Sequence, residues 1–177
     1  MNLWLLGRQR ELQIHGLDHT IDRFETMMDL YGWGNWPGFF PVELNRLPEQ
    51  EMAPVQETDE WRIYASPVSH IIPSVGLRIE FINSNKVLAY SGDTEPCTEM
   101  VNLAKDCNVL IHESTGASLG HSDAAQAGEI AKQAKAGQLY LIHYANGNFK
   151  DENIVIRAAE AFGGQVNLAE DFLELEF

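Results

Sequence analysis

Four histidines and one aspartate stand at predicted strand ends or in turns, where the ligand-binding residues of α/β proteins are usually found. The histidines are His70, His112, His121 and His143. Asp93 follows a predicted strand, and the absence of a side chain on Gly92 lets a metal ion or substrate approach the backbone there. Imidazole and carboxylate together suit Zn²⁺, with Mn²⁺ or Fe²⁺ as alternatives. These residue types therefore suggest a metal site.

The elements that would position these residues follow from the periodicity of the sequence. From residue 96 onward, helical and strand patterns alternate. The predicted strands are 11–15, 42–47, 61–69, 77–82, 86–91, 108–112, 138–143 and 165–168, and the predicted helices are the end of one over 1–10 and others over 18–31, 96–105, 122–136 and 151–162. This order predicts an α/β layered domain with a mixed sheet.

Local signals refine this outline. Asp18 and Ser122 are the expected N-caps of their helices. Residues 32–60 are rich in glycine and proline, which predicts a loop with one strand. The small residues between Ala124 and Ala134 predict close packing of a helix on the sheet.

Composition limits the classes of function. The 177 residues, 45% of them hydrophobic, are enough for one globular domain with its own core. Twelve Lys and Arg against 26 Asp and Glu give a net charge of −14, which makes nucleic acid an unlikely partner. No apolar stretch is long enough to suggest a membrane span. The two cysteines, Cys97 and Cys107, suit reduced thiols in a cytoplasmic protein.

Six short motifs follow one another between Val68 and Tyr144. They are Val68-Ser-His70, Gly76-Leu-Arg-Ile79, Tyr90-Ser-Gly-Asp93-Thr94, Ile111-His-Glu-Ser-Thr115, Gly120-His-Ser122 and Leu141-Ile-His143-Tyr144. In this order they resemble the second half of the metallo-β-lactamase fold, and within it the ribonuclease Z-like hydrolases. The resemblance implies a partial fold of αββα type, in which a mixed sheet is flanked by helices, as a single domain over residues 1–177.

The resemblance implies that three residues bind metal. His70 would be a ligand of the first metal and His143 of the second, with Asp93 bridging both. A complete site in this family holds two zinc ions, which activate a hydroxide for hydrolysis. The implied function is therefore metal-dependent hydrolysis. The implied substrate is a small molecule or a short chain that contains a phosphodiester or an ester.

Three further residues receive supporting roles from the resemblance. His121 would donate a proton near the leaving group, while His112 and Glu113 would orient the ligands. The residues by themselves also allow simpler, structural interpretations of these three side chains. His121 also fits a turn before a helix, and His112 with Glu113 fits a buried hydrogen-bonded pair at a strand end.

The chain also departs from the family pattern. The family motif HxHxDH is absent, and the segment from Ile14 to His19 does not match it. The resemblance therefore implies a domain truncated at its N-terminus, a site completed by another chain, or an inactive protein. The alternative function is a non-catalytic interaction or dimerisation module, with a homodimer as its simplest form. Only 22 residues separate His70 from Asp93, too few for an arm that grips transfer RNA.

Overall fold

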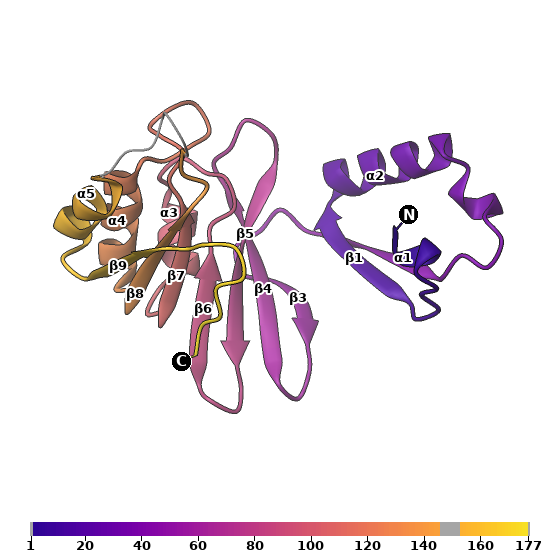
Figure 1. Cartoon of the computed structure of the whole chain (residues 1–177), viewed down its shortest axis with the longest axis horizontal. Helices are drawn as coiled ribbons and strands as arrows, with labels where there is room; N and C mark the ends of the chain where they lie inside the picture. The colour runs from indigo at the N-terminus through magenta and orange to yellow at the C-terminus, as the bar shows by residue number, and fades with distance from the viewer. Residues whose placement is uncertain (1, 146–152, 177) are drawn as a thin grey trace. The chain divides into compact units, whose positions relative to one another are not determined.

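The chain is described by a computed structural model that covers residues 2–145 and 153–176. It divides into two compact units, Met1–Pro48 and Glu49–Phe177, here called the N-terminal and C-terminal units (Figure 1). The interpretation of the whole chain as one metallo-β-lactamase-like domain stays a prediction.

The N-terminal unit combines a two-stranded parallel sheet with one long helix. Its elements are α1 (Asn2–Leu5), β1 (Leu12–Leu17), α2 (Asp18–Leu30), the 3-10 helix η1 (Trp33–Asn35) and β2 (Val42–Leu47). Ile21 is the buried residue of α2, whereas Met27 on the same helix and Tyr31 directly after it are exposed.

The predicted N-cap of α2 is wrong. Leu17 occupies the N-cap position without a side-chain hydrogen bond, and Asp18 is the first helical residue. The reason is an ion pair: the Asp18 carboxylate lies 3.2 Å from the Arg46 guanidinium on β2, which also contacts Asp22 at 2.7 Å. Asp18 therefore connects the helix to the strand beside it.

The C-terminal unit is built on a seven-stranded mixed sheet in the order β3-β4-β5-β6-β7-β8-β9. Pairing is antiparallel from β3 to β6 and parallel from β6 to β9. The strands are β3 (Ala53–Glu57), β4 (Trp61–Val68), β5 (Ser74–Phe81), β6 (Lys86–Tyr90), β7 (Val109–Glu113), β8 (Gln138–Ile142) and β9 (Gln165–Leu168). The prediction of a loop with a single strand over residues 32–60 is therefore wrong at β3, an edge strand where Pro54 is tolerated.

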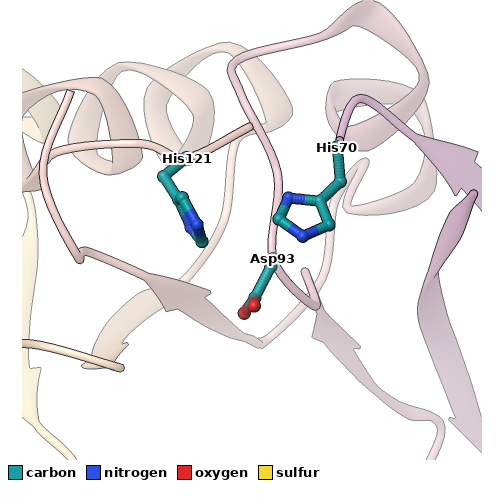
Figure 2. Close-up of side chains that lie close together, drawn as sticks. All are labelled: His70, Asp93 and His121. Carbon is teal, nitrogen blue, oxygen red and sulfur yellow. The ribbon is translucent and has the colours of Figure 1, made fainter. Parts of the chain in front are cut away.

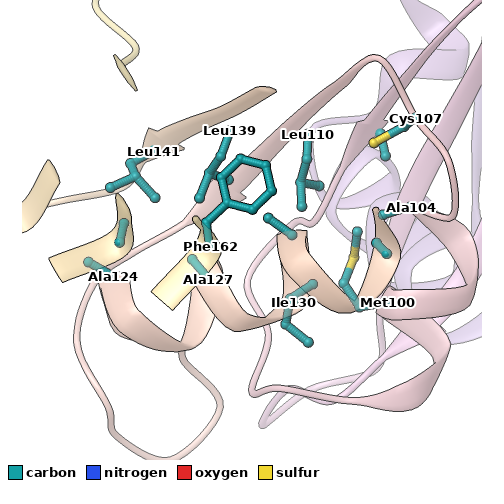
Figure 3. Packing of buried hydrophobic residues seen from close by; sticks show 14 of the residues in the cluster. Met100, Ala104, Cys107, Leu110, Ala124, Ala127, Ile130, Leu139, Leu141 and Phe162 are labelled. Carbon is teal, nitrogen blue, oxygen red and sulfur yellow. The ribbon is translucent and has the colours of Figure 1, made fainter. Parts of the chain in front are cut away.

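Three helices cover one face of this sheet (Figure 1). They are α3 (Thr98–Leu103), α4 (Ala124–Ala134) and α5 (Ile154–Phe162); of the range predicted for α5, residues 151–152 lie outside the described residues. Leu110 and Leu139 from the sheet pack with Ala127 and Phe162 from the helices in one buried cluster (Figure 3). The core therefore lies between the helices and the parallel strands.

The small residues of α4 serve two contacts. Ala127 packs in the core against the sheet, as expected. Gly128 instead faces α5, because a Cβ added there would clash with the Ala158 carbonyl oxygen. This part of the predicted helix–sheet packing is in fact helix–helix packing.

The N-cap of α4 is Asp123 and not Ser122. Asp123 Oδ1 accepts a hydrogen bond from the Gln126 backbone at 2.9 Å, and Gln126 Oε1 accepts one from the Asp123 backbone at 2.8 Å, which completes a capping box. Ser122 is fully buried, and its hydroxyl donates to the Thr94 carbonyl at 2.7 Å. Ser122 therefore fastens the start of α4 to the loop after β6.

None of the helices in the described part of the chain is long and apolar enough to cross a membrane.

Candidate metal and catalytic site

The predicted site residues gather at one edge of the C-terminal sheet. His70 follows β4, Asp93 follows β6, Glu113 ends β7 and His143 follows β8. β6, β7 and β8 are parallel, and β4 runs in the same direction because two antiparallel pairings separate it from β6. All four strands therefore deliver their carboxyl ends to the same edge, where α/β sheets usually bind ligands.

Gly92 and His143, at this edge, have left-handed backbone conformations. Gly92 has a φ of 62°, and a Cβ there would lie 2.9 Å from the Val75 carbonyl oxygen, so glycine is needed for close approach of the backbone. His143 has a φ of 50°, a left-handed conformation that is uncommon for residues other than glycine, although histidine adopts it more often than most. The Thr115 hydroxyl donates to the His143 carbonyl at 3.0 Å and helps to hold this turn.

The side chains form two overlapping groups of potential metal ligands. His70, Asp93 and His121 each offer a ligand atom, and these atoms lie within 4.8 Å of one another (Figure 2). Glu113, His121 and His143 form the second such group. His121 belongs to both, which the sequence did not suggest. Asp93 belongs to the first group and also contacts the second, because its Oδ1 lies 3.1 Å from His143 Nδ1.

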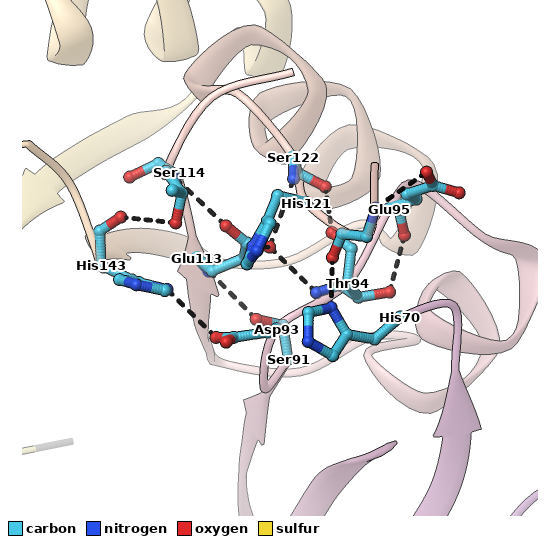
Figure 4. A network of polar contacts seen from close by, with 12 residues as sticks. His70, Ser91, Asp93, Thr94, Glu95, Glu113, Ser114, His121, Ser122 and His143 are labelled. Carbon is cyan, nitrogen blue, oxygen red and sulfur yellow. Dashed lines mark hydrogen bonds and ion pairs between the residues drawn. The ribbon is translucent and has the colours of Figure 1, made fainter. Parts of the chain in front are cut away.

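Hydrogen bonds fix the histidine rings (Figure 4). His70 Nδ1 lies 2.7 Å from the Gly120 carbonyl oxygen. Since a carbonyl oxygen can only accept, Nδ1 carries a proton, and in the neutral ring this leaves the lone pair on Nε2. His121 Nδ1 lies 2.9 Å from Glu113 Oε1. This arrangement, in which one ring nitrogen is held and the other is free, is typical of metal-binding histidines.

Glu113 is the centre of the polar network. Its fully buried carboxylate accepts hydrogen bonds from the backbone of Thr94 at 2.9 Å, Thr115 at 3.1 Å and Ser122 at 3.2 Å, besides its contact with His121. Burial raises the pKa of the Glu113 carboxyl, but these hydrogen bonds lower it, and the balance lies below the usual value. Glu113 is therefore a buried carboxylate that orients His121.

His112 lies apart from the ligand groups found among the described residues. It shares a face of β7 with Leu110, on the side of the helices, and is fully buried. Its Nδ1 donates to the Glu113 carbonyl at 2.8 Å, and its Nε2 has no protein partner in the described part of the chain. Burial lowers the pKa of His112, which favours the neutral ring. The role of His112 in orienting ligands stays a prediction.

Glu95 is a residue of this network that the sequence analysis missed. Its carboxylate contacts the loops that carry His70 and His121. A carboxylate directly after Asp93-Thr94 was the available signal, but nothing in the sequence linked it to Ser69 or Gly120.

The donor set fits a divalent transition metal. Imidazole nitrogens and a carboxylate converge within 4.8 Å, and the hydrogen bonds at Nδ1 of His70 and His121 leave each Nε2 available. Hard cations such as Mg²⁺ prefer oxygen ligands, so a site rich in imidazole favours softer metals.

A family model for the beta-lactamase superfamily domain matches residues 7–144. The chain therefore belongs to the beta-lactamase superfamily. The match runs through both compact units and includes the strand ends that carry the site.

Similar proteins place the chain in the ribonuclease Z-like branch. Ribonuclease Z of Methanothermobacter thermautotrophicus is 34% identical, over 96% of this chain and 71% of that protein. Ribonuclease Z of Picrophilus torridus is 38% identical over 101 residues, which are 52% of this chain and 32% of that protein. The second alignment thus spans about a third of its relative.

The fold is shared with a solved structure. The metallo-beta-lactamase fold protein YhfI from Bacillus subtilis superposes with a TM-score of 0.72 at 23% identity, over 90% of this chain and 63% of that one. These findings confirm the resemblance, and with it the α/β class and the mixed sheet flanked by helices. The relatives are named ribonucleases, so they do not support the expectation that nucleic acid is an unlikely partner.

Proposed function

We propose that this protein is a hydrolase that uses divalent metal ions, with zinc preferred, to cleave a phosphodiester or an ester. The observation that carries the proposal is the convergence of His70, Asp93 and His143 at the carboxyl edge of the sheet, where Asp93 shares a ligand group with His70 and lies 3.1 Å from His143. The relatives named ribonuclease Z support it. Nothing in the comparisons favours the alternative of a non-catalytic interaction or dimerisation module.

Three residues would hold the metal ions. His70 and His143 would each bind through Nε2, since Nδ1 of His70 contacts Gly120 and Nδ1 of His143 contacts Asp93. Asp93 would be shared, because it belongs to one group with His70 and contacts His143 directly. Bound zinc would supply a nucleophile at neutral pH by lowering the pKa of water, and would stabilise negative charge on the attacked centre.

Glu113 and His121 would handle the proton of the leaving group. The Glu113 carboxylate holds Nδ1–H of His121, so Nε2 is the atom that would carry a proton toward the substrate. Glu113 is buried and held by three backbone N–H groups, which fixes the direction of the ring. His121 also belongs to both groups of potential metal ligands, so the zinc content and the turnover of a His121 variant together distinguish a proton donor from a ligand.

The clefts beside the site indicate a substrate with little negative charge. A cleft of about 390 Å³ lies beside His121 and includes Glu95, and another of about 470 Å³ lies beside His143 and includes Glu170 and Asp171. No Lys or Arg is among the described residues that line them. Carboxylates repel polyanions, so a small or short phosphodiester or ester is favoured over a long nucleic acid.

Cys97 and Cys107 are free thiols, which agrees with the proposed cytoplasmic location.

Metal analysis tests the first part of the proposal. The protein would be dialysed against zinc and compared with His143→Ala and with His15→Ala, a matched control in the N-terminal unit. We expect zinc to bind the wild type and the control and to be lost in His143→Ala. Less than about 0.2 equivalents of zinc in the wild type, unchanged by His143→Ala, would contradict the proposal.

Turnover tests the second part. Bis(p-nitrophenyl) phosphate, p-nitrophenyl acetate and a short RNA would be compared as substrates of the zinc-loaded protein. We expect cleavage of the phosphodiester or the ester, and in His121→Ala a rate about 100-fold lower with unchanged zinc content. Loss of zinc in His121→Ala would instead make His121 a ligand, and no turnover of any substrate would refute the hydrolase.

A further inference from the structure

Glu95 joins three loops that carry site residues (Figure 4). Its Oε1 accepts a hydrogen bond from the Gly120 backbone N–H at 2.9 Å, next to His121. Its Oε2 accepts one from the Ser69 hydroxyl at 3.3 Å, next to His70. Its own backbone N–H donates to the Ser69 carbonyl at 2.7 Å. One side chain thus ties the loop after β4 and the loop before α4 to the loop after β6.

Gly120 connects Glu95 to His70 through two hydrogen bonds. The same residue that donates its N–H to Glu95 accepts the Nδ1–H of His70 on its carbonyl oxygen, at 2.7 Å. Gly120 has a φ of 82°, and a Cβ there would lie 2.7 Å from His70 Nδ1 and 2.8 Å from Ile71 Cγ1. The His70 ring therefore packs against the Gly120 backbone, so a shift of Gly120 would move the hydrogen-bond acceptor of His70.

Glu95 has no ion pair with a Lys or Arg in the described part of the chain. Its side-chain contacts are instead the backbone N–H of Gly120 and the hydroxyl of Ser69. Hydrogen bonds to an ionised carboxylate are about twice as strong as neutral ones. Both contacts of the Glu95 carboxylate are therefore with loops that carry site residues. Glu95 is half-buried and lines the same cleft as His121.

We propose that Glu95 is a positioning residue. Acting through Gly120, it holds the His70 imidazole with the proton on Nδ1 and leaves Nε2 free to bind a metal ion. The metal part of this inference rests on the proposed function, whereas the effect on the His70 tautomer does not. Glu95 itself would touch neither metal nor substrate.

Three variants separate this role from a general effect on stability. Glu95→Ala removes both hydrogen bonds of the carboxylate. Glu95→Gln keeps an acceptor for Gly120 N–H and a group that pairs with the Ser69 hydroxyl, but removes the charge. Glu129→Ala is the matched control, because Glu129 is exposed on α4 and hydrogen-bonds Gln133.

The first readout is the tautomer of His70 in metal-free protein, from nitrogen NMR of the histidine rings at pH 8, assigned with His70→Ala. The wild type, Glu95→Gln and Glu129→Ala should show a proton on Nδ1 of His70, and Glu95→Ala a mixture of tautomers. The second readout is zinc affinity by competition with a chromogenic chelator. We expect about 10-fold weaker binding in Glu95→Ala and a change within about twofold in Glu95→Gln.

The outcomes distinguish the two proposals. Absence of zinc binding in the wild type would refute the proposed function, while the tautomer measurement would still test Glu95. An unchanged tautomer in Glu95→Ala, or equal effects in Glu95→Ala and Glu95→Gln, would overturn the positioning role. If Glu95→Ala does not fold, Glu95→Asp is used instead, because its side chain is one methylene shorter and withdraws the carboxylate from the Gly120 N–H. An unchanged His70 tautomer in that variant would overturn the proposal.

Discussion

The two compact units differ in how they use apolar residues. The C-terminal unit buries a continuous cluster that includes Leu110, Leu139 and Leu141, each fully inaccessible. The N-terminal unit buries few apolar side chains and exposes others strongly, with Leu6 and Leu30 both 84% accessible. All the candidate site residues belong to the C-terminal unit. The site is therefore supported by a well-packed core, and perturbations of the two units should have unequal effects.

The largest expected effect separates the two units by core packing. Leu110→Ala should lower the free energy of unfolding by about 3 kcal/mol, because it removes a buried side chain and leaves a cavity. Leu30→Ala should change it by less than about 0.5 kcal/mol, since Leu30 is exposed. Urea unfolding measures both. Similar losses in the two variants would contradict the comparison.

A second pair compares carboxylates. Glu113→Gln should destabilise the protein by about 2 kcal/mol, because the buried amide would turn an N–H₂ group toward backbone donors. Glu25→Gln, at the exposed ion pair with Arg46, should cost less than about 1 kcal/mol. Urea unfolding at pH 7 measures the difference, and a larger loss at Glu25 would show that the buried network contributes little.

A third prediction concerns acid sensitivity of the C-terminal core. Burial lowers the pKa of His112, so the unfolded chain binds a proton more readily than the folded one. The neutral His112 ring makes its full contribution to the free energy of unfolding above about pH 6.5. This contribution is lost as the pH falls through the lowered pKa. His112→Phe should therefore reduce the slope of unfolding free energy against pH, by up to about 1.4 kcal/mol per pH unit. Urea unfolding between pH 5 and 8 checks this, and an unchanged slope would contradict it.

The smallest effect compares helix starts. Asp123→Ala should destabilise the protein by about 1 kcal/mol, because it removes the capping box of α4. Asp18→Ala should cost less, because Asp18 caps nothing and its exposed ion pair with Arg46 is weak. Thermal unfolding of both variants ranks them. The reverse order would show that the ion pairs of Arg46 stabilise more than the cap.

Local patterns predicted much of the fold. The sequence located β9 at its observed bounds and placed His70, Asp93 and His143 at strand ends, because strand periodicity and its termination are local signals. β3 was missed because Pro54 disfavours a strand except at a sheet edge, and edge position depends on the whole sheet.

The finer geometry of the site depends on contacts distant in sequence. The pairing of His143 with Asp93, and of His70 with Gly120, each joins residues 50 positions apart. Glu95 acquires its partners in the same way. The motifs predicted which residue types would meet, but the hydrogen bonds that fix their tautomers arise only from the assembled loops.

The left-handed backbone at His143 has an evolutionary consequence. A side chain with a Cβ is disfavoured in this conformation, and glycine or asparagine would relieve a cost of the order of 1 kcal/mol. The proposed metal-binding role of His143 would account for a histidine at this position despite the local cost in stability. In descendants freed from selection for that role, we expect this position to drift toward glycine or asparagine before the surrounding core changes.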